Sequence, residues 1–223
     1  MIEKCSTNNI RRIFIFILLL AFQMYSYFLY AQDQVAVTRH KGLFKEVYFT
    51  SKSDTTIRNG LCSIYYKGKI IEKGRYSNNK KAGRWRFFSL NGIFEYEYNY
   101  DIKELVSING INRHDLKKKT PCLFQGSPLI PYLYLVTNLG YPAKAKDKNI
   151  EGKVVLALKV NSQGEIYGFY IAEKLHPIID NAVINVAKTI PDDWKFLSAT
   201  YMGENVQSEY HITIEFELEE LEN

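Results

Sequence analysis

The chain has 223 residues, of which 46% are hydrophobic and 24% are charged, and its net charge at neutral pH is +5. This length is enough for one or two domains, each with its own hydrophobic core. The excess of basic residues is small, so the charge does not indicate a nucleic-acid-binding protein.

The N-terminal 31 residues have the pattern of a secretory signal. Basic residues precede an apolar run from Ile13 to Phe22, and the small residue Ala31 comes just before polar sequence. This pattern predicts a signal peptide over residues 1–31 with cleavage after Ala31. The alternative is an uncleaved membrane anchor, because residues 13–31 are about long enough to span a bilayer. Both alternatives place the rest of the chain in an extracytoplasmic space.

Cleavage leaves 26 basic and 23 acidic residues, a net charge of +3, and only two cysteines, Cys62 and Cys122. In an oxidising compartment such a pair could form a disulfide, which would stabilise the fold by about 4 kcal/mol. The alternative is two buried thiols that act as small hydrophobic side chains. We favour the thiols, because the repeat described next puts Cys62 at an inward position.

Residues 32–113 contain no proline and show internal repetition. Residues 60–65 align with residues 83–88 at an offset of 23, and each run is followed by a glycine turn at Gly68 or Gly92. Each unit therefore predicts a β-hairpin, and successive hairpins would share an aromatic core. The pattern G-x-W-x-x-Y/F followed by N-G resembles the MORN-type hairpin repeat over about residues 55–102. That resemblance implies a spacer module, or a contact with a membrane or a protein.

Acidic and aromatic residues alternate at the end of this repeat. Glu95 and Glu97 are interleaved with Tyr96 and Tyr98. The alternation predicts a half-buried strand on which both carboxylates face the solvent.

A second β-hairpin is predicted between residues 150 and 175. The first strand has apolar and partly β-branched residues at Val154, Val155, Leu156, Leu158 and Val160, and Ile166–Ile171 forms a second apolar run. The intervening Asn161–Gly164 supplies a turn in which Gly164 can adopt a positive φ. Two strands are only marginally stable alone, so further elements must complete the sheet.

The flanking sequence supplies these elements. Residues 114–123, with a run of three lysines, predict a solvated linker, and residues 124–220 a second domain. We predict helices at Pro128–Leu139, over a turn or two from Pro142 to Lys148, and from Pro177 to Ile190. Tyr210–Leu218 alternates apolar and polar residues, which predicts an antiparallel strand with one buried face.

Six pieces then occur in a recognisable order. They are Y-P-x-x-A from Tyr141, x-I-E-G-K-V from Asn149, the hairpin at Gly164, I-D-N-A-V from Ile179, Trp194, and G-x-x-V from Gly203 with the strand that ends in I-x-F at Phe216. The succession resembles the TonB C-terminal domain over about residues 120–218. We therefore expect an α+β protein: an N-terminal antiparallel β-hairpin repeat module, then a TonB-like domain with a three-stranded antiparallel sheet and two helices on one face.

The resemblance implies a cell-envelope protein of the periplasm that captures an extended segment of an outer-membrane TonB-dependent receptor. Such a segment adds as a strand to a sheet edge, in TonB-dependent transmembrane transport. The resemblance also implies inner-membrane motor proteins as partners. The matching positions for receptor contact are Tyr141 and Pro142, and the pairing edge carries Tyr210, Ile212, Ile214 and Phe216. The alternative role for Tyr141 and Pro142 is to pack against and kink the chain that enters the sheet.

The chain departs from the family in two ways. The apolar segment of residues 13–31 has no histidine to engage a motor, and hairpin repeats stand where the family has a long Pro-rich spacer. Energy transduction by this chain is therefore in doubt. The alternative function is a periplasmic protein–protein interaction scaffold without a transport role.

No pattern of catalytic or metal-binding residues is evident. The four histidines (His40, His114, His176 and His211) are scattered. The pair Asp192–Asp193 is typical of a solvated turn, and no nucleophile, zinc or phosphate-loop motif occurs. We expect no enzyme, no catalytic residues, no cofactor or metal, and no nucleic-acid or small-molecule substrate.

Overall fold

The computed structural model describes residues 12–13, 15–24, 34–90, 92–111 and 113–218. Residues 12–13 and 15–24 are helical. No helix in these ranges is long and apolar enough to cross a membrane. The expected cleavage site after Ala31 lies outside the described residues.

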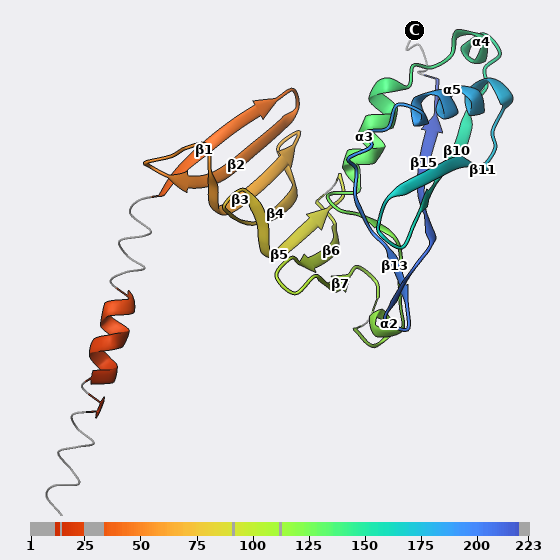
Figure 1. The fold of residues 1–223 in the computed structure, drawn as a ribbon. Helices are drawn as coiled ribbons and strands as arrows, with labels where there is room; N and C mark the ends of the chain where they lie inside the picture. Colours follow the sequence, from red (N-terminus) through yellow and green to blue (C-terminus); the bar gives the residue numbers. More distant parts are fainter. Residues whose placement is uncertain (1–11, 14, 25–33, 91, 112, 219–223) are drawn as a thin grey trace, which may run out of the picture.

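The first module is a seven-stranded antiparallel sheet in which consecutive strands are neighbours, from β1 to β7 (Figure 1). We call it the repeat sheet. Its strands are β1 (Gln34–Lys41), β2 (Phe44–Ser51), β3 (Arg58–Tyr66), β4 (Lys69–Ser77), β5 (Lys80–Phe88), β6 (Phe94–Asn99) and β7 (Glu104–Ile108). The predicted hairpins are present, and the structure adds strands β1 and β7, which the repeat pattern did not indicate.

One face of the repeat sheet carries a buried aromatic row. Its members are Tyr48, Cys62, Tyr76, Trp85, Phe87 and Tyr96. Cys62 and Trp85, which the sequence repeat places in equivalent positions, are 2% and 0% exposed. The Trp85 ring lies directly over Gly74, where an added Cβ would come within 2.3 Å of a ring carbon. Gly74 therefore makes room for the large side chain of the next strand.

The expectation that Glu97 faces the solvent is wrong, because Glu97 is 4% exposed. Its carboxylate pairs with the guanidinium groups of Arg84 at 3.3 Å and Arg86 at 2.5 Å, both on the neighbouring strand β5. These long side chains cover the carboxylate while they pair with it, which makes burial of the charge tolerable.

Cys62 and Cys122 are both free and buried, as favoured from the sequence. Burial raises the pKa of the Cys62 thiol to about 12 and that of the Cys122 thiol to about 11. Both thiols therefore remain protonated at neutral pH.

The second module contains the predicted three-stranded antiparallel sheet, in the order β11-β10-β15. Its strands are β10 (Gly152–Val160), β11 (Ile166–Glu173) and β15 (Ser208–Phe216). The turn between β10 and β11 has Gly164 at φ +79°, and its N–H donates to the Asn161 carbonyl at 3.0 Å. An added Cβ at Gly164 would come within 2.1 Å of the Phe196 carbonyl oxygen, so close packing also requires glycine there.

Helices cover one face of this sheet. The longer ones are α3 (Leu129–Asn138) and α5 (Pro177–Ala187), and α4 (Ala143–Lys146) is a single turn. His176 begins α5, because its side chain accepts a hydrogen bond from the Ile178 N–H at 3.2 Å, and Pro177 follows at the first helical position. Val183, on the inner face of α5, is 0% exposed in the core. The mixed α+β architecture is thus confirmed.

The segment of residues 114–123, which the sequence analysis treats as a linker, holds regular structure. Helix α2 (Arg113–Lys118) is followed by the short strands β8 (Lys119–Thr120) and β9 (Leu123–Phe124). Strand β8 joins β13 (Ala199–Tyr201) and β14 (Glu204–Val206) in one small sheet, and β9 pairs with β12 (Phe196–Leu197). The three lysines of the segment are exposed.

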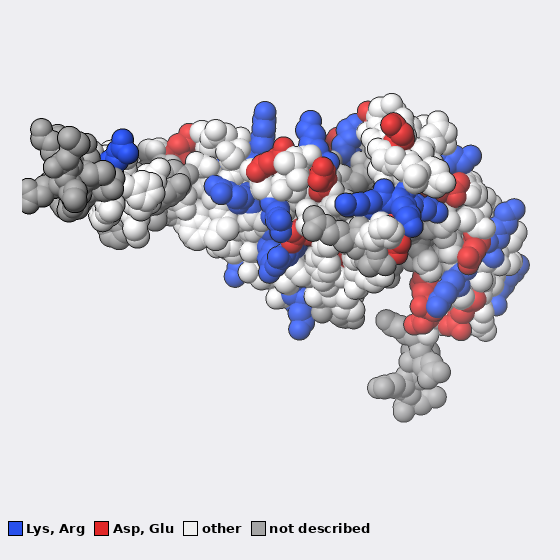
Figure 2. Space-filling model, turned by 90° about the horizontal axis from the view of Figure 1, so that it is seen from below, with Lys and Arg blue, Asp and Glu red and all other residues white. Residues whose placement is uncertain are grey.

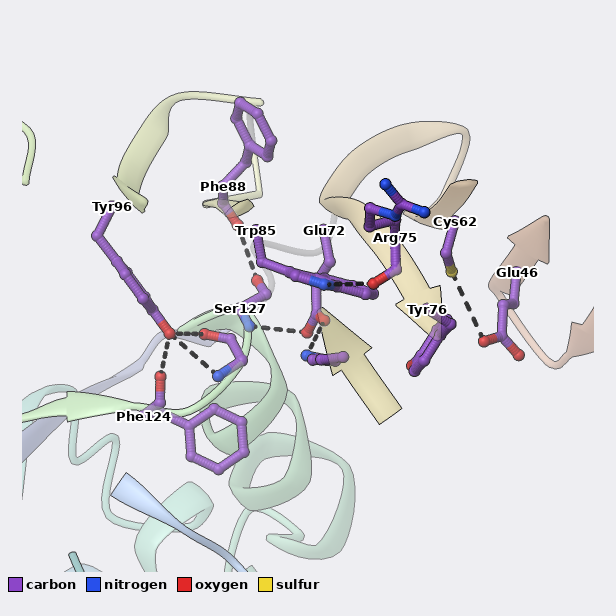
Figure 3. Close-up of polar contacts among 12 residues, drawn as sticks. Glu46, Cys62, Glu72, Arg75, Tyr76, Trp85, Phe88, Tyr96, Phe124 and Ser127 are labelled. Carbon is purple, nitrogen blue, oxygen red and sulfur yellow. Dashed lines mark hydrogen bonds and ion pairs between the residues drawn. The ribbon is translucent and has the colours of Figure 1, made fainter. Parts of the chain in front are cut away.

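The two modules meet through buried polar contacts (Figure 3). The Tyr96 hydroxyl of the repeat sheet donates to the Phe124 carbonyl at 2.5 Å and accepts from the Gly126 N–H at 3.1 Å. The Glu72 carboxylate accepts from the Ser127 N–H at 2.9 Å and pairs with Lys81 at 2.9 Å. The repeat sheet is therefore docked on the chain that leads into α3.

Basic side chains are spread over the face seen in Figure 2, and acidic side chains lie among them. In this view neither sign of charge covers the whole face.

Candidate peptide-binding edge

Strand β15 forms one edge of the three-stranded sheet. It pairs with β10 along its whole length, from Gly152 opposite Phe216 to Val160 opposite Ser208. Within the part of the chain that the structure describes, no strand pairs with the other side of β15. Every second residue of an antiparallel edge strand directs its backbone N–H and C=O away from its partner. Strand β15 therefore offers a row of backbone groups to an added strand.

The four edge residues predicted from the sequence lie on β15, with their side chains turned inward. Ile212, Ile214 and Phe216 are between 2% and 5% exposed, and Tyr210 packs against the same core. Their side chains are thus occupied within the domain. Only their backbone groups are available to a partner at this edge.

Tyr141 and Pro142 lie between α3 and α4. The Tyr141 ring meets the Phe216 ring edge-on with centroids 5.3 Å apart, and its hydroxyl donates to the Ile150 carbonyl at 2.5 Å. Pro142 has an extended conformation and precedes the first residue of α4. The packing role considered for Tyr141 is therefore observed, and contact of Tyr141 or Pro142 with a partner stays a prediction.

Helix α3 packs against β15 on the core side. The Tyr134 ring of α3 contacts Trp194, and Phe196 in turn contacts Tyr210 at the start of β15. Tyr141, just after α3, contacts Phe216 at the end of β15. Helix α3 therefore lies next to β15 on the core side, and alternate side chains of a strand added at this edge would point toward the same side of the sheet.

The opposite face of β15 carries polar residues that the sequence analysis did not select. Glu209 accepts hydrogen bonds from the Tyr170 hydroxyl at 2.9 Å and lies 3.1 Å from the His211 Nε2. The hydrogen bond with His211, and to a smaller extent the one with Tyr170, lowers the pKa of the Glu209 carboxyl group. Lys159 lies over the Tyr170 ring at 5.3 Å. The strict alternation of β15 could have indicated these outward residues, but Tyr170 and Lys159 lie on other strands.

Near the end of β15, Glu215 pairs with Lys153 at 3.3 Å, and both side chains are exposed. Thr213 lies between His211 and Glu215 on the same face and is also exposed. The face next to the edge therefore carries charges of both signs, and it would not repel a peptide of either net charge.

The residues considered for catalysis lie apart. Asp192 and Asp193 are exposed in a turn, and His176 is the helix cap described above. Among the described residues, no group of three or more His, Cys, Asp or Glu side chains could hold a metal ion.

A comparison with known families gives a match to this part of the chain. Residues 137–218 match the family model of the Gram-negative bacterial TonB protein C-terminal. The match begins at the end of α3 and includes β10, β11, α5 and β15. No curated protein and no solved structure gives a significant match.

This match supports the TonB C-terminal family for residues 137–218 of the second module, and we call this module the TonB-like domain. The family implies a protein of the cell envelope that takes part in TonB-dependent transport and interacts with outer-membrane receptors. The matched segment contains Tyr141, Pro142 and the whole of β15, so every residue predicted for partner binding falls within it.

Proposed function

We propose that the TonB-like domain binds an extended periplasmic segment of an outer-membrane TonB-dependent receptor by strand addition at β15. The observation that supports this proposal is the outer edge of β15, which no strand of the described residues pairs with and which lies within the segment that matches the family. Strand addition gains affinity from main-chain hydrogen bonds. An edge whose own inward side chains are buried is suited to that mode of recognition.

The length of the edge is sufficient for strand addition. Strand β15 has nine residues and β11 at the opposite edge has eight, whereas β13 and β14 have three each. A long unpaired edge is usually blunted by charge or covered, because it would otherwise recruit other chains. Here Glu209 and Glu215 are the acidic side chains of β15, and both are already paired with neighbours of the same sheet.

The rest of the chain has a supporting role in this proposal. The N-terminal segment directs export to the periplasm, where it is cleaved or retained as an anchor, and inner-membrane motor proteins are further partners. The MORN-like hairpin repeats form a rigid module attached to the receptor-binding domain. The protein acts by binding and not as an enzyme, and it requires no cofactor.

A scaffold without a transport role is the second candidate. It is favoured by the docking of the repeat sheet on the TonB-like domain through Tyr96 and Glu72. A module held by buried contacts does not extend the reach of its neighbour as a Pro-rich spacer does. In this alternative both modules bind other envelope proteins.

Site-specific crosslinking separates the two candidates. A photoreactive amino acid is placed at Thr213, an exposed position on β15, and the full chain is mixed with synthetic peptides from the periplasmic N-termini of receptors. We expect a crosslink at Thr213 that is lost when alternate peptide nitrogens of the synthetic segment are methylated, because methylation removes the main-chain donors.

The matched control is Tyr167, which is 55% exposed on β11 at the opposite edge of the same sheet. Equal crosslinking at Thr213 and Tyr167, or crosslinking that tolerates methylation, would contradict strand addition at β15. Absence of any receptor crosslink in cells, with other envelope proteins captured instead, would favour the scaffold.

A further inference from the structure

A cavity of about 620 Å³ lies between the repeat sheet and the start of the TonB-like domain. Its walls come from β1 to β5 on one side and from residues 124–126 and Ile130 on the other. Sites for small molecules have volumes of about 300–1,000 Å³ and combine apolar walls with a few polar groups. The docking of the two modules therefore creates a space of the right size for a small ligand, away from the β15 edge.

The apolar part of this cavity is aromatic and aliphatic. Phe44, Ile64 and Tyr76 line it from the repeat sheet, and Phe124 and Ile130 line it from the TonB-like domain. Phe44, Ile64 and Ile130 are only partly buried. A ligand with an apolar body would remove the remaining surface of these residues from water.

The positive side chains that line the cavity outnumber the negative ones. Two carboxylates line it, and each is already paired: Glu46 with Arg58 at 3.0 Å and Glu72 with Lys81 at 2.9 Å. Arg39 and Lys41 also line the cavity, and neither pairs with an acidic side chain in the described ranges. The cavity therefore has a surplus of positive charge on the strand β1 side.

Two of the guanidinium groups that line the cavity, Arg39 and Arg58, each lie near the ring of Tyr48 on strand β2. The Arg39 and Arg58 guanidinium carbons lie 5.1 and 5.0 Å from the centroid of the Tyr48 ring. Arg58 uses its side-chain donors on Glu46 and on the Tyr76 hydroxyl, which leaves three of its five N–H donors for another acceptor. The Tyr48 hydroxyl is buried and has no hydrogen-bond partner among the described residues.

We propose that this cavity binds a small organic carboxylate, with the carboxylate at Arg39 and Arg58 and an apolar body against the aromatic walls. A guanidinium group is the side chain best suited to hold a carboxylate, through parallel N–H···O bonds. The two internal ion pairs hold Arg58 and Lys81 in place before the ligand arrives. The proposal does not depend on receptor binding, because the β15 edge contributes no residue to the cavity.

Calorimetric titration of the full chain with three matched probes tests the proposal. The probes are 4-phenylbutyrate, its neutral amide 4-phenylbutyramide, and the cation 4-phenylbutylamine. We expect the carboxylate to bind at least about tenfold more tightly than the amide, and the amine not to bind, because only the carboxylate complements the surplus positive charge.

Two substitutions with the same change of charge locate the site. Arg39→Gln removes an exposed guanidinium that lines the cavity, and we expect it to weaken 4-phenylbutyrate binding about tenfold. Arg75→Gln removes an exposed guanidinium of the same sheet that does not line the cavity, and it should leave binding unchanged. Equal affinity for the carboxylate and the amide, or equal effects of the two substitutions, would overturn the proposal. So would the absence of binding by all three probes.

Discussion

The Tyr96 hydroxyl donates a hydrogen bond to the Phe124 carbonyl oxygen at 2.5 Å, and this contact joins the two modules of the protein (Figure 3). Tyr96 is 2% exposed on β6 of the repeat sheet, and Phe124 lies on β9, 28 residues later. The same hydroxyl accepts from the Gly126 N–H. One side chain thus satisfies two backbone groups at the boundary between modules.

Replacing Tyr96 with phenylalanine tests this boundary. The ring remains, but the Phe124 carbonyl and the Gly126 N–H lose a buried partner, so we expect the free energy of unfolding to fall by about 1–3 kcal/mol. Urea unfolding followed by circular dichroism measures the change. Tyr98→Phe is the control, because the Tyr98 hydroxyl makes no hydrogen bond within the described part of the chain. Equal stabilities for the two variants would show that the Tyr96 hydroxyl does not hold the modules together.

Gly74→Ala tests the packing of the aromatic row. The added methyl group would meet the Trp85 ring at 2.3–2.5 Å, so the indole must move, and we expect a loss of about 1–3 kcal/mol. Near-ultraviolet circular dichroism reports the tryptophan environment, and thermal unfolding reports stability. Gly168→Ala is the matched control, since its new methyl group would meet only the Lys159 side chain at 3.7 Å. If the two substitutions were equally well tolerated, Trp85 would not require glycine on the neighbouring strand.

Val183→Asp tests the contact between α5 and the sheet. Val183 is 0% exposed in an apolar core, so a carboxylate there has no partner, and we expect destabilisation by about 4 kcal/mol or more at neutral pH. The loss should be smaller at pH 4, where the new side chain is protonated more easily. Chemical unfolding at the two pH values provides the measurement. Asn185→Asp, at an exposed position of the same helix, should change stability little.

The buried thiols predict a dependence of stability on alkaline pH. The pKa values of Cys62 and Cys122 are raised to about 12 and 11, from about 8.5 in an unfolded chain. Burial favours the protonated thiol in the folded state. Its contribution to stability is therefore complete below the unfolded pKa and is lost as the pH rises toward 11–12. Urea unfolding between pH 7 and 10.5 should show a falling free energy.

Thiol labelling checks the same property at constant pH. In a Cys5→Ser background, iodoacetamide at pH 8 should modify Cys62 and Cys122 slowly in the folded protein and rapidly in urea, because the thiolate is the reactive form. Rapid labelling of the folded protein would contradict the burial of these thiols. A double Cys62→Ala, Cys122→Ala variant should show a shallower alkaline loss of stability.

Local sequence patterns were sufficient to predict the hairpin at Gly164, the helix that begins at His176, and the alternation of β15. Each depends on residues close together in the chain, such as the N–H of Gly164 and the carbonyl of Asn161. The burial of Glu97 was missed, because its partners Arg84 and Arg86 lie on another strand. Strands β1 and β7 were missed because they lie outside the repeated units.

The sequence by itself indicated the two modules and the inward positions of Cys62 and Trp85, since periodicity and turn residues are local properties. The choice of β15 as the candidate edge came from the resemblance to the TonB C-terminal domain. Only the tertiary structure decided that the segment of residues 114–123 is built into small sheets, that Tyr141 packs on Phe216, and that both modules line an open cavity with surplus positive charge. These features depend on which distant side chains and backbone groups come within contact distance, and that is settled only when the chain is folded.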